Sequence, residues 1–496
     1  MAATTKTIPT TKPTPTINPP ATTMPPSPNK KIRNYSMDIK SVLSEYLRFP
    51  GISADPSAKQ AIADTAKFLA GLLSRAGATP QIVETAGNPI VVGRFNAERS
   101  DLPHVIIYGH YDVQPVDPVE LWETPPFEPT FRDGKIFARG SADNRGPHAV
   151  AVVAFANLLA RRPDLPIRAT FVIEGEEEIG SGSFPQFLRD NKAELSTGDF
   201  VMLSDTESPA RDLIAITIGL RGVVGLEVEF EGPNCDLHSG IFGGAIYNPL
   251  QALAEICASL HKPDGTVNVP GFYDDMTPPA GWERNELARL PQTDESLKKF
   301  CGTDALHCLP GYSGTEATRF APTLEFNGIG GGYQGAGSKT IVPAKAFAKI
   351  TCRLVPAMSP DDIFQKVSAA ILARVPAGIR AKITRMQECP PYYICPPNHA
   401  DAATMPNRAL AAAFSAAHEI IAAQFGNPPV YTRDGGSIGI VEEFRKVCGL
   451  NSLMLGFFLP ESKIHSPNEN IDVAFLEKGV KTYEAVFEKI ADAGKA

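Results

Sequence analysis

Three short hydrophobic runs in the first half of the chain each lead into an imidazole or a carboxylate side chain. The runs and the polar residues that follow them are 105–108 with His110 and Asp112, 169–173 with the acidic segment 174–178, and 200–203 with Asp205. Apolar runs of this kind, alternating with helical stretches, are typical of a mainly parallel sheet that is buried on both faces. Because ligands bind outside the carboxyl ends of such strands, the nitrogen and oxygen donors should meet in one crevice. The pattern therefore predicts a metal site.

Composition limits the classes of protein to which the chain can belong. Its 496 residues are too many for a single hydrophobic core and predict at least two domains. A net charge of −8 argues against nucleic acid and anionic membranes as partners, and no apolar run approaches the length of a membrane-spanning helix. All cysteines lie between Cys235 and Cys448 without a CxxC pair, which predicts reduced thiols and a cytoplasmic location.

Changes in sequence texture divide the chain into four segments. Residues 1–34 are rich in Thr and Pro and are expected to form a disordered tail, with a targeting role as the alternative. Residues 35–213 and 396–496 combine helical spacing with buried strands, which predicts two parts of one α/β domain around a mainly parallel sheet. Residues 214–395 show alternating strands and predict an inserted α+β domain.

Five motifs carry a resemblance to a known family. They are residues 108–115 (YGHYDVQP), 139–144 (RGSADN), 174–181 (EGEEEIGS), 204–205 (SD) and 465–469 (HSPNE). Together and in this order they resemble metallopeptidase family M20, in the branch of the cytosolic non-specific dipeptidases and carnosinases. The resemblance extends from about Ser41 to the C-terminus and includes the insertion.

The resemblance implies a dinuclear metallohydrolase domain with an inserted lid and dimerisation domain. It assigns His110 and Asp205 to one divalent ion, Glu178 and His465 to a second, and Asp143 to a bridge between the two. Imidazole and carboxylate ligands suit Zn²⁺, with Mn²⁺ or Co²⁺ as alternatives. Two such ions can polarise a carbonyl group and activate water.

Further residues receive roles around these ions. Glu177 matches the family's general base, which takes a proton from water and delivers it to the leaving amine. Asp112 lies two residues beyond His110, where an extended chain returns to the same face, so we expect it to accept the second imidazole N–H. The resemblance also implies a cis peptide bond between Asp143 and Asn144. Many members carry a second aspartate where this chain has Asn144, so the charge around the ligands is expected to differ.

The same resemblance assigns residues to substrate recognition. His238, within residues 235–240, is expected to reach the site of a partner subunit and stabilise the oxyanion. Thr340 and Arg353 match positions that hold the terminal carboxylate of the substrate, for which a guanidinium is a natural bidentate partner. Gly436 and Ser437 belong to a loop whose backbone N–H groups and hydroxyl can bind the same end. The expected assembly is a homodimer formed through the lid domain.

The expected function is hydrolysis of dipeptides or short peptides with a free C-terminal carboxylate. An N-acyl or N-carbamoyl amino-acid amidohydrolase of the same family is the main alternative, and a member that runs the amide reaction in the condensing direction is another. A non-catalytic scaffold that retained the fold is disfavoured because every ligand and base position is present. The glycine-rich run 328–333 lacks the lysine and the strand–loop–helix context of a P-loop, which excludes nucleotide binding there.

Overall fold

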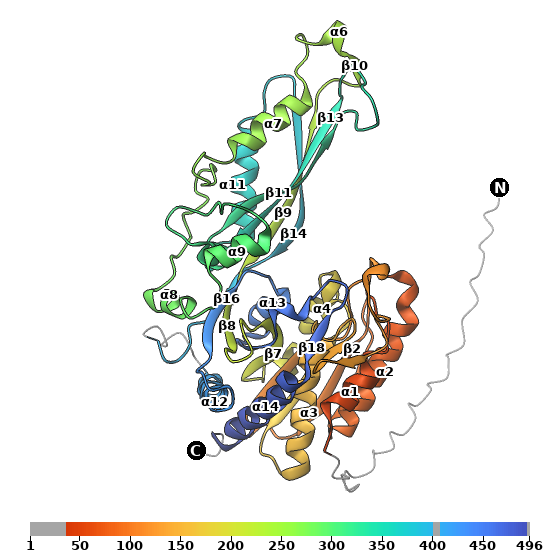
Figure 1. The fold of residues 1–496 in the computed structure, drawn as a ribbon, viewed down its shortest axis with the longest axis vertical. Coiled ribbons are helices and arrows are strands. Elements are labelled where there is room, and N and C mark those ends of the chain that lie inside the picture. The colour runs from red at the N-terminus through yellow and green to blue at the C-terminus, as the bar shows by residue number, and fades with distance from the viewer. Residues whose placement is uncertain (1–35, 400–406, 494–496) are drawn as a thin grey trace, which may run out of the picture.

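The computed structural model describes residues 36–399 and 407–493. The predicted Thr/Pro-rich tail lies outside the described residues. The chain forms a broad part that contains both ends of the described sequence and an elongated insertion that projects away from it (Figure 1). Within the described ranges, no helix has both the length and the apolar character that a membrane crossing requires.

A nine-stranded sheet forms the centre of the broad part, in the order β1-β2-β6-β3-β7-β17-β8-β15 with β16 beside β8. Its strands are β1 (Thr79–Val83), β2 (Ile90–Phe95), β3 (His104–His110), β6 (Arg168–Glu174), β7 (Phe200–Glu207), β8 (Ala215–Leu220), β15 (Tyr392–Tyr393), β16 (Val430–Asp434) and β17 (Ser452–Phe458). The four central strands, β6, β3, β7 and β17, are parallel. All residues of β3, β6 and β17 are buried, as expected for strands covered on both faces.

Helices cover both faces of this sheet. They are α1 (Ile39–Tyr46), α2 (Lys59–Arg75), α3 (Arg145–Arg161), α4 (Phe184–Asp190), α5 (Lys192–Leu195), α12 (Arg408–Phe425), α13 (Gly439–Cys448) and α14 (Val473–Ala493). Tyr108 of β3 contacts Phe184 of α4 and Phe444 of α13. Its neighbour Gly109 faces the opposite side, where a Cβ atom would lie 2.6 Å from His148 of α3. This close approach brings the start of α3 to the end of β3, where His110 lies.

The insertion is built on a second, antiparallel sheet in the order β11-β13-β9-β14. Its strands are β9 (Gly222–Glu231), β11 (Thr323–Gly331), β13 (Lys345–Leu354) and β14 (Arg380–Cys389), and its long helices are α7 (Pro249–Ser259) and α11 (Pro360–Leu372). Buried and exposed residues alternate along β13, because one face packs on these helices in a separate hydrophobic core. A small distal ladder joins β10 (Leu237–His238) to β12 (Ile341–Val342). The large parallel-centred sheet and the inserted sheet confirm the predicted α/β class with an inserted α+β unit.

The chain passes between the two sheets at two points. The predicted insertion begins at residue 214, but β8 pairs with β16 and β17 in the large sheet, so the first passage lies at Arg221. The return lies between β14 and β15, because β15 pairs with β8. A three-stranded ribbon of β4 (Thr130–Arg132), β5 (Lys135–Phe137) and β18 (Asn470–Asp472) completes the broad part.

Part of the inserted segment packs against the large sheet rather than the second one. Helices α8 (Gly281–Leu287), α9 (Asp294–Cys301) and α10 (Gly314–Phe320) lie near the base of the insertion (Figure 1). Leu287 and Phe320 share a small core with Val430 of β16. Glu283 of α8 forms a buried ion pair with Arg433 of β16, with Oε1 and Nε 2.7 Å apart. This segment therefore anchors the insertion on the sheet that carries most of the predicted metal ligands.

Candidate metal centre

The structure brings together the five residues predicted to bind metal. They come from the end of β3 (His110), the turn before α3 (Asp143), the turn after β6 (Glu178), the end of β7 (Asp205) and the loop between β17 and β18 (His465). Their donor atoms form two clusters that share one aspartate, His110–Asp143–Asp205 and Asp143–Glu178–His465, and within each cluster they lie within 4.8 Å of one another. Donors from distant parts of the chain therefore converge at the carboxyl ends of the parallel strands.

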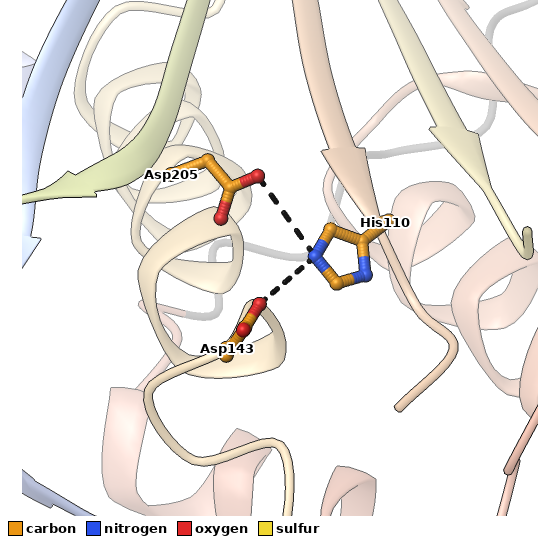
Figure 2. A group of neighbouring side chains, drawn as sticks. All are labelled: His110, Asp143 and Asp205. Atoms are coloured by element: carbon orange, nitrogen blue, oxygen red, sulfur yellow. Dashed lines mark hydrogen bonds and ion pairs between the residues drawn. The ribbon is translucent and has the colours of Figure 1, made fainter. Parts of the chain in front are cut away.

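The first cluster is deeply placed. The Nε2 atom of His110 lies 3.1 Å from Oδ1 of Asp143 and 3.9 Å from Oδ2 of Asp205. Figure 2 shows the two carboxylates pointing toward the same ring nitrogen from two different elements. The His110 side chain is fully buried, so water does not screen the interaction of its ring with the two carboxylates.

The second cluster uses the other oxygen of the shared aspartate. The Nε2 atom of His465 lies 2.8 Å from Oδ2 of Asp143 and 3.3 Å from Oε2 of Glu178. Each oxygen of Asp143 thus faces a different imidazole. This is the arrangement that a carboxylate bridging two ions requires.

The charges in this crevice fit divalent cations. Burial raises the pKa of Asp205 to about 7, with Asp143 and Glu178 adding repulsion while His110 opposes the shift. Burial also raises the pKa of Glu177 well above its ordinary value, and the nearby carboxylates add to that shift. The Oε1 atom of Glu178 is buried and has no hydrogen-bond partner among the described residues. Buried carboxylates packed together in this way need compensating positive charge, which two divalent ions would supply.

Asp112 contacts the ring nitrogen of His110 that faces away from the clusters. Its Oδ1 atom lies 3.3 Å from Nδ1, and its carbonyl oxygen lies 3.2 Å from the same nitrogen. The carboxylate also accepts the backbone N–H groups of Glu177 at 3.3 Å and Glu178 at 3.1 Å. One buried carboxylate therefore fixes the ring of His110 and the turn that carries both glutamates.

Asn144 has a specific role that an aspartate at this position could not fill. The peptide bond between Asp143 and Asn144 is cis, as the resemblance implies. The Nδ2 atom of Asn144 donates to Oδ1 of Asp205 at 2.8 Å and to the carbonyl oxygen of Ser204 at 2.5 Å. An ionised carboxylate has no hydrogen to donate. The amide therefore holds Asp205 in place without adding negative charge.

Two further residues position the ligands and were not assigned roles from the sequence. Glu469 is buried and accepts the backbone N–H groups of Gly140, Ala142 and Asp143 at 2.8–3.0 Å, which fixes the turn that presents Asp143. Gln114 donates from Nε2 to Oε2 of Glu178 at 2.8 Å. Gln114 lies in motif 108–115 and Glu469 in motif 465–469, so their place in these motifs was the sequence signal that could have identified them.

Glu177 lies beside the clusters without belonging to either. It begins a short 3₁₀ turn, Glu177–Ile179, and is half-buried. Its carboxylate forms no hydrogen bond or ion pair with any residue in the described part of the chain. It lines a cavity of about 540 Å³ together with Ser437. A carboxylate with a raised pKa that faces a cavity next to metal ligands is suited to proton transfer.

Three of the predicted recognition residues meet at the base of the insertion. Arg353, near the end of β13, donates from Nη1 to Oγ of Ser437 at 3.1 Å. The Ser437 hydroxyl also donates to the carbonyl oxygen of Arg221. The N–H of Gly436 donates to Oδ1 of Asp434 at 2.9 Å, so this amide is already engaged.

The other two recognition residues lie at the opposite end of the insertion. His238 pairs with Ile341 in the β10–β12 ladder, and the N–H of Ser239 donates to the carbonyl oxygen of Thr340 at 2.9 Å. Both His238 and Thr340 are exposed. Figure 1 shows β10 and α6 (Ser239–Phe242) at the tip of the insertion, away from the large sheet. Within one chain these residues do not join the metal centre.

Comparison with known proteins places this geometry in a family. The profile of Peptidase family M20/M25/M40 matches residues 106–489. The Cys-Gly metallodipeptidase dug1 of Schizosaccharomyces pombe is 28% identical over 465 residues, which cover 90% of this chain and 94% of that protein. The human Beta-Ala-His dipeptidase is 28% identical over 407 residues, covering 78% of this chain and 75% of that protein.

A solved structure gives the same result. The M20 family metallo-carboxypeptidase Sso-CP2 of Sulfolobus solfataricus superposes with a TM-score of 0.79 at 28% identity, covering 92% of this chain and 100% of that one. The predicted resemblance to the M20 dipeptidases and carnosinases is confirmed, and the chain is a peptidase. It belongs to Peptidase family M20/M25/M40.

Proposed function

We propose that the protein hydrolyses dipeptides, or short peptides with a free C-terminal carboxylate, at a dinuclear metal centre. The observation that carries this proposal is the pair of donor clusters that share Asp143, with Glu177 beside them. The dipeptidases among the relatives support the same substrate class.

The residues fit two divalent ions. His110 and Asp205 would hold one ion, Glu178 and His465 the other, and Asp143 both. Zn²⁺ suits this mixture of imidazole and carboxylate, and Mn²⁺ or Co²⁺ are alternatives. When bound, the ions would polarise the scissile carbonyl and lower the pKa of a water molecule.

The protein residues then provide proton transfer and orientation. Glu177 takes the proton of the attacking water and delivers it to the leaving amine, a role that its cavity-facing carboxylate supports. Asp112 fixes the tautomer of His110, so that Nε2 keeps its lone pair directed at the clusters. Asn144 and Gln114 hold the carboxylates of Asp205 and Glu178 by hydrogen bonds.

Recognition of the substrate would involve two chains. Arg353, Gly436 and Ser437 would bind the terminal carboxylate at the base of the insertion. His238 and Thr340 at the tip would reach the same substrate only from the partner of a homodimer that forms through the insertion. His238 would then stabilise the oxyanion.

We place the protein in the cytoplasm. The free thiols support a reducing compartment; they are Cys235, Cys257, Cys301, Cys308, Cys352, Cys389 and Cys448.

Matched substrates test the proposal. The metal-reconstituted protein is assayed with alanyl-glycine, N-acetyl-glycine and N-carbamoyl-alanine, and product amino acids are quantified. We expect glycine to be released from alanyl-glycine much faster than glycine from N-acetyl-glycine or alanine from N-carbamoyl-alanine. Preference for the acylated or carbamoylated compounds would replace the proposal with the amidohydrolase alternative. No turnover of any compound at full metal occupancy would favour a scaffold.

A further inference from the structure

A second cavity, of about 580 Å³, lies at the end of β7 and is lined by none of the predicted ligand, base or recognition residues. Its walls combine Glu207 at the end of β7, Asp434 at the end of β16, Gly435 after it, and residues of α9 and α10 that include Arg319. Its volume is typical of small-molecule sites. It shares no lining residue with the cavity at Glu177.

Glu207 connects this cavity to the metal centre. It follows Asp205 by two residues on β7, and alternate residues of a strand face the same side with Cα atoms about 7 Å apart. The burial along the strand agrees with this, because Thr206 is buried while Asp205 and Glu207 are both partly exposed.

The loop after β16 separates the two cavities. Gly435 lines the cavity at Glu207, whereas Ser437 lines the cavity at Glu177. A dipeptide held by its carboxylate near Ser437, with its scissile carbonyl at the clusters, would therefore extend its amino-side residue toward Glu207. One residue spans about 3.5 Å, which is within the Cα spacing of about 7 Å between Asp205 and Glu207.

The Glu207 carboxylate in this cavity interacts with the charge of Arg319 but receives no hydrogen bond from it. It forms no hydrogen bond or ion pair with residues 36–399 or 407–493. Arg221 donates to the carbonyl oxygen of Gly435 at 3.0 Å, and Asp434 accepts the N–H of Gly436. Arg319 donates to Gln292 at 3.1 Å, while its Nε atom is buried without a partner among the described residues. A half-buried carboxylate that receives no hydrogen bond from the protein is free to accept hydrogen bonds from a ligand.

We infer that this cavity is the subsite for the residue on the amino side of the scissile bond, and that Glu207 binds an ammonium group of that residue. The inference rests on the proposed function and specifies its substrate class. An ammonium offers three donors and the opposite charge, which matches a carboxylate in a confined site. The group can be the α-ammonium or the ammonium of a basic side chain, and these two sources differ in their consequences.

Four acyl-glycines of equal chain length distinguish the sources. Norleucyl-glycine carries the α-ammonium alone, 6-aminohexanoyl-glycine the terminal ammonium alone, lysyl-glycine both, and hexanoyl-glycine neither. For wild type and Glu207→Gln, kcat/KM is measured where turnover occurs, and the competitive inhibition constant where it does not. Glu461→Gln serves as the control, because this carboxylate lies in the same neighbourhood but pairs with Arg211.

In Glu207→Gln, loss of a charge-assisted hydrogen bond should lower kcat/KM, or raise the inhibition constant, about ten- to hundredfold for the affected compounds relative to hexanoyl-glycine. If Glu207 binds the α-ammonium, norleucyl- and lysyl-glycine are affected; if it binds a side-chain ammonium, 6-aminohexanoyl- and lysyl-glycine are. Glu461→Gln should change these ratios less than about twofold.

An equal change for all four compounds, or no change, would overturn the inference while leaving the proposed function intact. Turnover of norleucyl-glycine or lysyl-glycine by the wild type reports on the proposed function itself, and absence of turnover of both would remove both proposals. The thermal midpoint of Glu207→Gln separates misfolding from lost recognition, because removing an unpaired carboxylate should not lower it.

Discussion

The metal centre and the recognition residues are organised in different ways. The proposed metal ligands come from five separated positions but converge at one edge of one sheet, within a single chain. The recognition residues divide into a group at the base of the insertion, around Arg353 and Ser437, and a group at its tip, around His238. The difference indicates that one chain can hold the ions, and it favours the proposal that a substrate site completed by His238 needs two chains.

The largest loss of activity is expected when Asp143, which belongs to both clusters, is replaced. Asp143→Ala should lose binding at both metal positions, so turnover should fall by more than about 10⁴-fold. Elemental analysis of the purified variant, with kcat measured in parallel, checks this. Two retained ions per chain would contradict the bridging role.

Glu177→Gln should separate proton transfer from metal binding. Because Glu177 belongs to neither cluster, the variant should keep its metal content while kcat falls by about 10²–10⁴-fold. Near-normal kcat at full occupancy would refute the assignment of the base.

His238→Ala tests whether recognition crosses between chains. The variant alone should lose about 10²–10³-fold in kcat with its ions retained. Heterodimers that combine a His238→Ala chain with a Glu177→Gln chain contain one intact site, so they should recover about half of the wild-type activity. Two affinity tags allow these heterodimers to be purified. No recovery would mean that His238 acts within its own chain or has no role in turnover.

Asp112→Asn should have a moderate effect through His110. Loss of the carboxylate that orients the ring should weaken metal affinity about 10–100-fold. Competition with a chelating dye measures the affinity, and Asp133→Asn, in the exposed β4–β5 turn, is the matched control. Equal affinities for both variants would show that the contact has no influence on the ions.

The last effect, which changes only tenfold with each pH unit, concerns the protons that metal binding releases. Hydrogen bonds with Asp143 and Glu178 raise the pKa of His465 to about 10, so the ring of the metal-free protein is protonated at neutral pH. Metal must displace this proton, so apparent affinity should fall about tenfold for each pH unit below 10. Calorimetric titrations in buffers of different ionisation enthalpy count the protons. Binding without proton release at pH 7.5 would contradict the pairing of His465 with these carboxylates.

The metal centre was more predictable from the sequence than the recognition residues. Ligands such as His110 and Asp205 directly follow apolar strands, and parallel strands bring such residues to one edge by geometry alone. The hydrogen bond from Asn144 to Asp205 was not predictable, because it joins a turn to a strand 61 positions away. The sequence also did not show that the chain enters the insertion at Arg221. In sequence, β8 resembles the alternating strands that follow it, and only its pairing with β16 and β17 places it in the large sheet.

The division of the recognition residues could not be read from the chain. Arg353 and Thr340 are close in sequence, but β13 runs the length of the insertion between them and places them at opposite ends. The two-residue strands β10 and β12 that set the position of His238 are too short to leave a pattern.

The most direct test of the dinuclear centre is a crystal structure of the zinc-reconstituted protein with anomalous scattering recorded on both sides of the zinc edge. Two peaks are expected, one among His110, Asp143 and Asp205 and the other among Asp143, Glu178 and His465. A single peak, or peaks that these five side chains do not contact, would contradict the account.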